Sequence, residues 1–253
     1  MSKSQLNYLL LYLTYKPYMP ASVFHFKRFT ILQDKCAMKV GTDGVLLGAW
    51  ISLEKAEHIL DIGTGTGLIA LMMAQKYDAQ IDAIDIDNDA FMQALVNVNT
   101  SPWSNRLRVI HASLQDFQPH SKFDLIVSNP PYFIDSFAPS DEARNRARQA
   151  SASLSYEELL QGIIRLLTSS GKFCVILPSK EGVIFREKAE QDGLFCNRIT
   201  HVHTIIGKPA KRVLMEFSRI DEVLKENDII LRESDTTFTE AYKELTKEFY
   251  PAF

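Results

Sequence analysis

The stretch Asn129-Pro130-Pro131-Tyr132 directly follows the apolar run at 123–128. This run is short, rich in branched residues and bounded by turn formers, so it predicts a buried strand that ends in a tight loop. Two consecutive prolines donate no backbone hydrogen bonds and fix the backbone, so the loop is stiff. Its amide, its carbonyl oxygens and its aromatic ring could hold a planar group that carries an NH2. Asn and Pro are also ordinary turn residues, so the motif alone does not decide between the two readings.

A second motif, Asp61-Ile62-Gly63-Thr64-Gly65-Thr66-Gly67, joins the apolar run at 58–62 to another at 68–74. This order predicts a strand, a glycine-rich turn and a helix, in which the glycines let the backbone approach a ligand closely. The spacing is GxGxG and not the GxGxxG of dinucleotide-binding proteins. Because a carboxylate at Asp61 would repel a pyrophosphate, we expect a ligand with positive charge.

The next predicted strand, at 80–85, again ends in an acid, Asp85. In nucleoside-binding doubly wound sheets a carboxylate at this position accepts both ribose hydroxyls, and we expect that role here. Asp87 and Asp89 are expected to cap and open a helix at 88–99.

Further strands are predicted at 107–111 and 123–128, so strands and helices alternate. Such a chain forms a parallel sheet with helices on both faces, and ligands bind beyond the carboxyl ends of its strands. Asp61, Asp85, Ser113 and Asn129 all fall at such ends. One crevice could therefore hold all four.

The other predicted elements complete an α/β domain. Helices are expected at 45–50, 156–167 and 180–192, and strands at 172–177, 198–206 and 212–217. The last two strands, joined by a basic connection at 207–211, predict a hairpin at one edge of the sheet. Thr42 or Asp43 is expected to cap the first of these helices, or else to contact the ammonium group of a cofactor.

Composition sets the class of protein. The 253 residues are 46% hydrophobic with a net charge of −3, which suits one domain with a full core and gives no strong overall attraction to polyanions. We expect an extension at 1–18 and a single domain at 19–253 with an acidic end, because 220–253 hold nine acidic and four basic residues. Nothing in the sequence indicates an oligomeric state.

Cysteine usage and hydropathy indicate the compartment. Cys36, Cys174 and Cys196 stand far apart without CxxC spacing, which favours a reducing cytoplasm and argues against a zinc site, so no metal is expected. The apolar segment at 6–13 is too short to span a bilayer, so no membrane association is expected.

Two basic segments are candidates for binding nucleic acid. Between 21 and 39, aromatic residues alternate with basic ones, including Lys27, Arg28 and Lys39, a pattern that suits bases and phosphates. An edge hairpin with aromatics in the core and lysines in water explains the pattern equally well. The second segment, after the proline loop, carries alternating arginines that we expect to face a substrate, although a solvated helix turn is the alternative: Arg144, Arg146 and Arg148.

Together, the glycine motif, Asp85 and Asn129-Pro130-Pro131-Tyr132 resemble the S-adenosylmethionine-dependent methyltransferases of the seven-stranded class I fold. The proline motif resembles that of the members that methylate exocyclic or amide nitrogens. Stretches at 24–29, 39–44 and 46–50 are similar to the opening of the tRNA1(Val) adenine-37 N6-methyltransferase family. The similarity extends over about residues 19 to 220, and Lys39-Val40-Gly41-Thr42-Asp43-Gly44 is its most specific part.

This resemblance implies a Rossmann-like α/β sheet with an antiparallel edge hairpin, S-adenosylmethionine as cofactor and tRNA as partner. It implies cofactor contacts at eight positions: Thr42, Asp43, Asp61, Gly63, Gly65, Asp85, Ile86 and Ser113. Relatives often carry an acid where this chain has Ser113, so the contact to the cofactor adenine differs here. Asn129 and the carbonyl of Pro130 would hold the target amine beside Pro131, and Tyr132 would stack on a flipped base.

The main alternative is a glutamine N5-methyltransferase that acts on a protein, because the same loop can hold an amide. Enzymes of that type usually carry a helical domain ahead of the glycine motif, whereas fewer than about sixty residues precede it here. A DNA adenine or rRNA guanine methyltransferase would need a recognition domain that the sequence does not show. A non-catalytic RNA-binding module would predict damaged cofactor residues, and these residues are intact.

Overall fold

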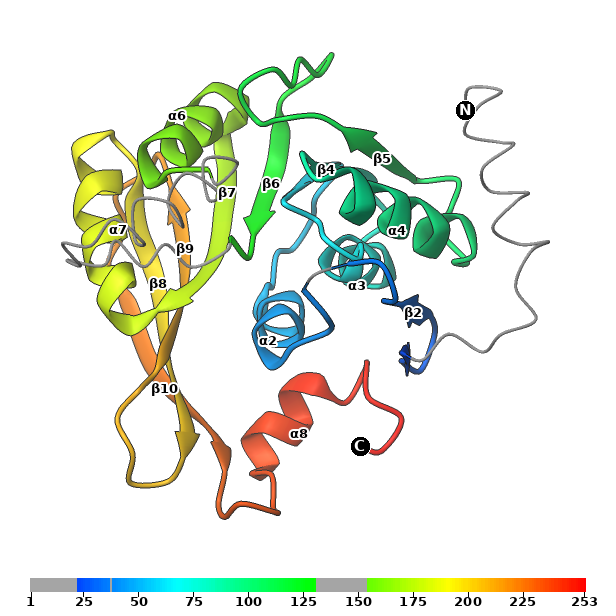
Figure 1. The fold of residues 1–253 in the computed structure, drawn as a ribbon. Helices are drawn as coiled ribbons and strands as arrows, with labels where there is room; N and C mark the ends of the chain where they lie inside the picture. The colour runs from blue at the N-terminus through cyan, green and yellow to red at the C-terminus, as the bar shows by residue number, and fades with distance from the viewer. Residues whose placement is uncertain (1–21, 37, 131–153) are drawn as a thin grey trace, which may run out of the picture.

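A computed structural model describes residues 22–36, 38–130 and 154–253 of the chain (Figure 1). Pro131 and Tyr132 of the proline motif, the three arginines of the second basic segment and the expected extension at 1–18 lie outside these ranges. The elements, in chain order, are β1 (Val23–His25), β2 (Thr30–Leu32), α2 (Thr42–Trp50), β3 (His58–Ile62), α3 (Leu68–Lys76), β4 (Gln80–Asp85), α4 (Asn88–Asn99), β5 (Leu107–His111), β6 (Phe123–Ser128), α6 (Tyr156–Leu166), β7 (Leu167–Pro178), α7 (Ser179–Gln191), β8 (Phe195–Ile205), β9 (Arg212–Ser218), β10 (Lys225–Arg232) and α8 (Glu240–Thr246).

The core of the molecule is one sheet with the strand order β10-β8-β9-β7-β6-β3-β4-β5. The pairs from β7 through β6, β3 and β4 to β5 are parallel, and β9 runs antiparallel to both β7 and β8. The predicted α/β class, with a mostly parallel sheet and an antiparallel hairpin, is confirmed. The strands and helices predicted between 80 and 128 begin and end at the predicted residues.

An eighth strand, β10, extends this sheet beyond the predicted seven. It pairs in parallel with β8, so the β8–β9 hairpin is one strand in from the edge. The acidic end that the sequence predicts at 220–253 contains this strand and the helix α8. The strand escaped prediction because its first four residues, Lys-Glu-Asn-Asp, are exposed and show no apolar alternation.

Each face of the sheet has its own hydrophobic core, because alternate residues of a strand point to opposite faces. In β3, Ile59 packs with residues of α2, α3 and α4, whereas Leu60 and Ile62 pack with residues of α6 and α7. Figure 1 shows α6 and α7 next to each other, and α2 beside α3. Both sides of the central strands are therefore covered, and their carboxyl ends are the part left for a ligand.

The hairpin β1–β2 packs its aromatic residues into the first of these cores. Phe26 and Phe29 are buried, with ring centroids 4.6 Å apart, and Tyr250 stacks on Phe26 at 5.9 Å. Of the two readings of the aromatic and basic pattern, the structure therefore favours the core hairpin for the aromatic rings. The hairpin thus joins the C-terminal segment to the sheet domain.

The helices of the described ranges do not combine the length and the apolar character that crossing a bilayer requires. Cys36, Cys174 and Cys196 are buried and have free thiols.

Helix α2 packs tightly against α3, and Gly48 makes this possible. A Cβ at this position would lie 2.5 Å from Met72 Sδ and 3.1 Å from Met72 Cβ, and Met72 is fully buried. Lys76 Nζ also donates to the carbonyl of Ala49 at 2.9 Å, at the end of α2. The position of α2, which carries Thr42 and Asp43, is therefore set by close contact with α3.

We predict that Gly48→Ala destabilises the protein by about 1–3 kcal/mol, because the added methyl overpacks the contact by more than the gain in helix propensity. The free energy of unfolding in urea measures this change. Adding Met72→Ala provides space, so the double variant should lose less stability than the sum of the two single variants. Strictly additive losses would contradict this account of the α2–α3 contact.

Candidate functional site

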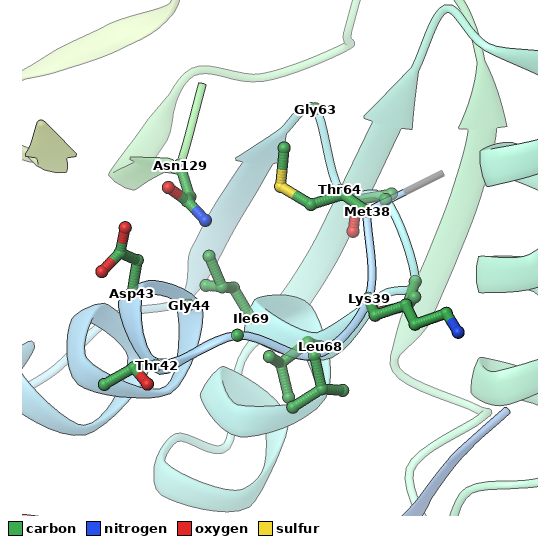
Figure 2. A pocket seen from close by; sticks show the side chains of 14 residues that line it. Met38, Lys39, Thr42, Asp43, Gly44, Gly63, Thr64, Leu68, Ile69 and Asn129 are labelled. Atoms are coloured by element: carbon green, nitrogen blue, oxygen red, sulfur yellow. The ribbon is translucent and has the colours of Figure 1, made fainter. Parts of the chain in front are cut away.

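A cavity of ≈ 300 Å³ opens at the carboxyl ends of the parallel strands (Figure 2). Its wall is made by three separate parts of the chain: the segment 38–44, the glycine turn at 63–66 with the start of α3, and Asn129. Figure 2 shows Asn129 and Asp43 on one side of the cavity and Lys39 on the other. Asn129, the first residue of the proline motif, and the glycine turn therefore share one cavity.

Asn129 and the glycine turn lie together because β3 and β6 are neighbours in the sheet. Ile62, the last residue of β3, pairs with Ser128, the last residue of β6. The buried Ser128 hydroxyl also donates a hydrogen bond to the Ile62 carbonyl at 3.0 Å. Gly63 and Asn129 come directly after these two residues, so the strand register fixes their separation.

The glycine turn is folded against the end of β4. The N–H groups of Gly63 and Thr64 both donate to the Ile84 carbonyl at 3.0 Å. Gly63 has a φ of +68°, and a Cβ there would meet nothing within 4 Å. The backbone at this position is therefore open to a ligand, and its left-handed conformation favours glycine over other residues.

Asp61 lies beneath this turn and is 1% exposed. Its Oδ2 accepts hydrogen bonds from the Thr64 hydroxyl at 2.6 Å and from the Ala70 N–H at 3.1 Å. Its Oδ1 is buried and has no hydrogen-bond partner in the described part of the chain. Burial raises the pKa of this carboxyl to about 7, against the lowering effect of the two hydrogen bonds. The protein thus keeps an acceptor oxygen that a donor or a cation could satisfy.

Asp85 connects the end of β4 to the glycine turn. Its Oδ2 accepts from the Gly65 N–H at 2.8 Å, and its Oδ1 accepts from the Asp87 N–H at 2.9 Å. Burial is also the main cause that raises the pKa of Asp85. Ile86 follows, 52% exposed, and provides an apolar surface beside this carboxylate. As predicted, Asp87 caps α4 by accepting from the Ala90 N–H at 2.8 Å.

Ser113 follows the end of β5 but does not line the cavity. Its hydroxyl donates to a carboxylate oxygen of Asp116 at 2.7 Å and accepts from the Asp116 N–H at 3.1 Å. An acid three residues later, Asp116, therefore lies next to Ser113. Of the four residues expected in one crevice, Asn129 alone lines this cavity. Asp61 and Asp85 are hydrogen-bonded to the glycine turn, and Ser113 follows the end of β5.

The stretches 32–36 and 38–40, which lead into the cavity wall, are held by three buried amides that the sequence did not reveal. Gln33 accepts from the Val40 N–H at 2.6 Å, and Gln93 of α4 accepts from the Lys35 N–H at 3.1 Å. Asn97 donates to the carbonyls of Leu32 and Thr66, both at 2.8 Å. Asn97 thus ties the N-terminal hairpin to the glycine turn.

The start of α2 differs from the expectation. Gly41 is the N-cap, and no side chain of the described residues makes a capping hydrogen bond, so the predicted capping by Thr42 or Asp43 is wrong. Asp43 Oδ2 instead accepts from Arg212 Nε at 2.8 Å, across the cavity wall to β9. Because these residues are 169 positions apart, no local pattern could have predicted the pair.

Three of the basic residues predicted to bind RNA, Lys27, Arg28 and Lys39, lie in the described ranges and have different surroundings. Lys39 is exposed and lines the cavity. Lys27 Nζ donates to the carbonyls of Lys247 and Phe253, and the Arg28 guanidinium lies 5.3 Å from the centroid of the Trp103 ring. Lys27 therefore contacts the C-terminal segment and Arg28 contacts an aromatic ring of the protein. Their contact with RNA stays a prediction.

Clusters of three or more histidine, cysteine, aspartate or glutamate residues that could hold a metal ion do not occur in the described ranges.

Comparison with known proteins identifies the family. A family model described as "Methyltransferase small domain" matches residues 37–180. A protein of Bacteroides fragilis named tRNA1(Val) (adenine(37)-N6)-methyltransferase is 46% identical over 238 residues, which cover 92% of this chain and 99% of the relative. The chain belongs to this methyltransferase family. Relatives with the same name in Trichodesmium erythraeum and Actinobacillus pleuropneumoniae are 46% and 43% identical and cover 92% and 90% of the chain, and 99% and 96% of the relatives. The predicted family is confirmed.

Solved structures agree on the fold of this methyltransferase. A crystal structure from Agrobacterium tumefaciens, described as a predicted O-methyltransferase, superposes with a TM-score of 0.64 at 18% identity and covers 82% of this chain and 96% of its own. A crystal structure from Listeria monocytogenes, described as a class I S-adenosylmethionine-dependent methyltransferase, gives a TM-score of 0.53 at 16% identity and covers 74% of this chain and 62% of its own. At these identities the likeness concerns the fold alone.

The buried carboxyl of Asp61 predicts a pH dependence of stability. Its pKa in the folded protein, about 7, exceeds the ordinary 3.8, so the folded state holds the proton more tightly than the unfolded state. Its contribution to stability is therefore complete below about pH 4 and is lost as the pH rises through about 7. Asp61→Asn keeps the two accepted hydrogen bonds and removes the titration.

We expect the wild type to lose stability relative to Asp61→Asn across this range, by on the order of a few kcal/mol. The free energies of unfolding of both proteins, measured without added cofactor between about pH 4 and 8, give this difference. A difference that stays constant with pH would contradict the raised pKa.

Proposed function

We propose that this protein transfers a methyl group from S-adenosylmethionine to the exocyclic N6 of an adenine in tRNA, and that the nucleotide is adenine 37 of a valine tRNA. The observation that carries the proposal is the cavity shared by Asn129 and the glycine turn. Membership of the family, and the names of relatives that match almost their whole length, support the substrate. The residue roles below are part of the proposal.

The cavity fits the methionine end of S-adenosylmethionine. The open backbone at Gly63 suits a ligand with N–H donors. The buried Asp61 Oδ1, which lacks a hydrogen-bond partner among the described residues, suits a ligand that carries positive charge. A carboxylate at this depth gains from a cation because the ion then replaces the water that burial removed. Thr42 and Asp43 would approach the same group from the opposite wall.

The nucleoside part would extend from Gly65 along the end of β4. Each carboxylate oxygen of Asp85 has one backbone partner, and carboxylate oxygens can accept further bonds, here from the ribose hydroxyls. The exposed Ile86 side chain would cover one face of the adenine ring. Ser113 would lie near the adenine amine, and the adjacent Asp116 carboxylate could accept from that amine.

Asn129 is proposed to prepare the acceptor nitrogen. An adenine amine is a poor nucleophile because its lone pair is delocalised into the ring. Two accepted hydrogen bonds, one to the Asn129 side-chain oxygen and one to the Pro130 carbonyl, would favour a tetrahedral nitrogen with a directed lone pair. The bound cofactor supplies an electrophilic methyl group on a sulfonium, and holding both reactants in place can contribute roughly 7 to 11 kcal/mol.

The substrate base must leave its stack to reach this cavity. We propose that Tyr132 stacks on the flipped base beside Pro131, and that Lys39 at the cavity edge contacts a nearby phosphate. Arg144, Arg146 and Arg148 follow the proline loop in the sequence and are proposed to contact the same RNA. Lys27 and Arg28 belong to the same proposal. The reaction would take place in the cytoplasm, with tRNA as the partner.

Mass spectrometry of nucleosides tests the proposal. The protein is incubated with tRNA and S-adenosylmethionine that carries a labelled methyl group, and the RNA is digested to nucleosides. We expect the label in N6-methyladenosine, and only with tRNA that carries an unmodified adenine 37. Label that appears only in a protein substrate would instead support the glutamine N5-methyltransferase alternative.

We predict that Asn129→Ala lowers kcat by on the order of a hundredfold, because the target amine loses one of its two acceptors and its position. The affinity for S-adenosylmethionine, measured by calorimetry, should stay within about twofold, since the glycine turn and Asp61 hold the cofactor. Asn105→Ala, in an exposed turn before β5 at the opposite edge of the sheet, is a matched control and should retain full activity. Near-normal turnover of Asn129→Ala would exclude the proposed role.

A further inference from the structure

The turn between β8 and β9 carries positive charge that the proposed site does not use. It reads Ile206-Gly207-Lys208-Pro209-Ala210-Lys211, and no acidic residue lies between His203 and Arg212. Lys208 and Lys211 are exposed, and the described ranges contain no acidic partner for either ammonium group. The Lys208 N–H donates to the Ile205 carbonyl at 3.2 Å, and Gly207 adopts a φ of +76°, so the turn is closely folded.

This turn lies at the same edge of the sheet as the cavity. Strand β8 runs in the direction of β7, because both are antiparallel to β9, so it also ends at the carboxyl edge. Arg212, which follows Lys211, donates to Asp43 at 2.8 Å, and Asp43 lines the cavity. The turn is thus joined through one residue to the cavity wall that also carries Asn129.

Helix α7 adds a third lysine to this edge. The Ser179 N–H donates to the Lys211 carbonyl at 3.2 Å, and the Ser179 hydroxyl donates to the Ala210 carbonyl at 2.9 Å. Lys180, the next residue, is exposed and likewise has no acidic partner in the part of the chain that the structure describes. These two hydrogen bonds from Ser179 therefore connect the two elements that carry the three lysines.

We propose that this surface, the lysine turn (residues 206–211 with Lys180), binds the phosphate backbone of the substrate RNA beside the target nucleotide. The inference rests on the proposed function and assigns the surface that holds the RNA. A base that is flipped into a cavity leaves its own phosphates at the rim, where lysines can neutralise them. Asp43 and Asn129 lie opposite Lys39 in Figure 2, so the lysine turn and Lys39 would hold the backbone from two sides.

Charge reversal of the turn, K208E/K211E, tests the proposal against a matched pair, K122E/K225E. Lys122 and Lys225 are also exposed, but they precede β6 and open β10, at the amino ends of parallel strands. We expect the Kd of the turn variant for tRNA to rise on the order of tenfold, and its log Kd to depend less on log salt by roughly 0.7 to 0.9 for each phosphate that the variant no longer neutralises. The control pair should bind tRNA like the wild type.

The neutral variant K208A/K211A should weaken tRNA binding in the same direction but by less. Calorimetry with S-adenosylmethionine should give wild-type affinity for both turn variants, and kcat at saturating tRNA should be unchanged while KM rises. Equal effects in the turn and control pairs, unchanged tRNA affinity or a failure to bind the cofactor would each overturn the proposal. If the wild type methylates tRNA and the turn variants bind tRNA normally, this inference fails while the proposed function stands. A wild-type protein that methylates no tRNA removes the function and this inference together.

Discussion

The pairing of β3 with β6 is the constraint on which the site depends. The chain leaves β3 outward through β4 and β5 and returns in β6 on the other side of β3, so the strand order reverses at this pair. In open α/β sheets a crevice forms where the order reverses, beyond the carboxyl ends of the strands. The Ser128 hydroxyl donates to the Ile62 carbonyl, so a hydrogen bond joins the last residues of the two strands. These residues are 66 positions apart in the chain. Because Gly63 and Asn129 directly follow these residues, the pairing of the strands sets the distance between them.

Around this pair the protein uses buried polar groups to fix the cavity before any ligand is bound. Gln93 and Asn97 of α4 hold the segment that leads into the cavity wall, and Asp85 holds the glycine turn. Asp61 instead lowers the stability of the free protein, because its buried Oδ1 has no hydrogen-bond partner within the described ranges. Such a cost is what a site for a cationic ligand would show, since binding then satisfies the carboxylate.

The structural features that the sequence predicted correctly are either local or follow from the order of the strands. The helix at 88–99 begins and ends as predicted because Asp87 caps it within the same segment. Asn129 and the glycine turn could be placed together because the order of strands and helices determines where their ends meet. The pair of Asp43 with Arg212 and the contacts of Lys27 with the C-terminal segment could not be predicted, because they join residues far apart in the chain. Strand β10 was missed because pairing with β8, and not apolar periodicity, defines it.

We infer that one cavity holds both the cofactor's sulfur and the acceptor amine. A crystal structure with S-adenosylhomocysteine and adenosine would show whether it does. We expect homocysteine density between the glycine turn and the segment 38–44, with the adenosine amine hydrogen-bonded to the Asn129 side chain and facing the sulfur. Homocysteine bound at another edge of the sheet, or an adenosine amine turned away from Asn129 while the sulfur lies in the cavity, would contradict it.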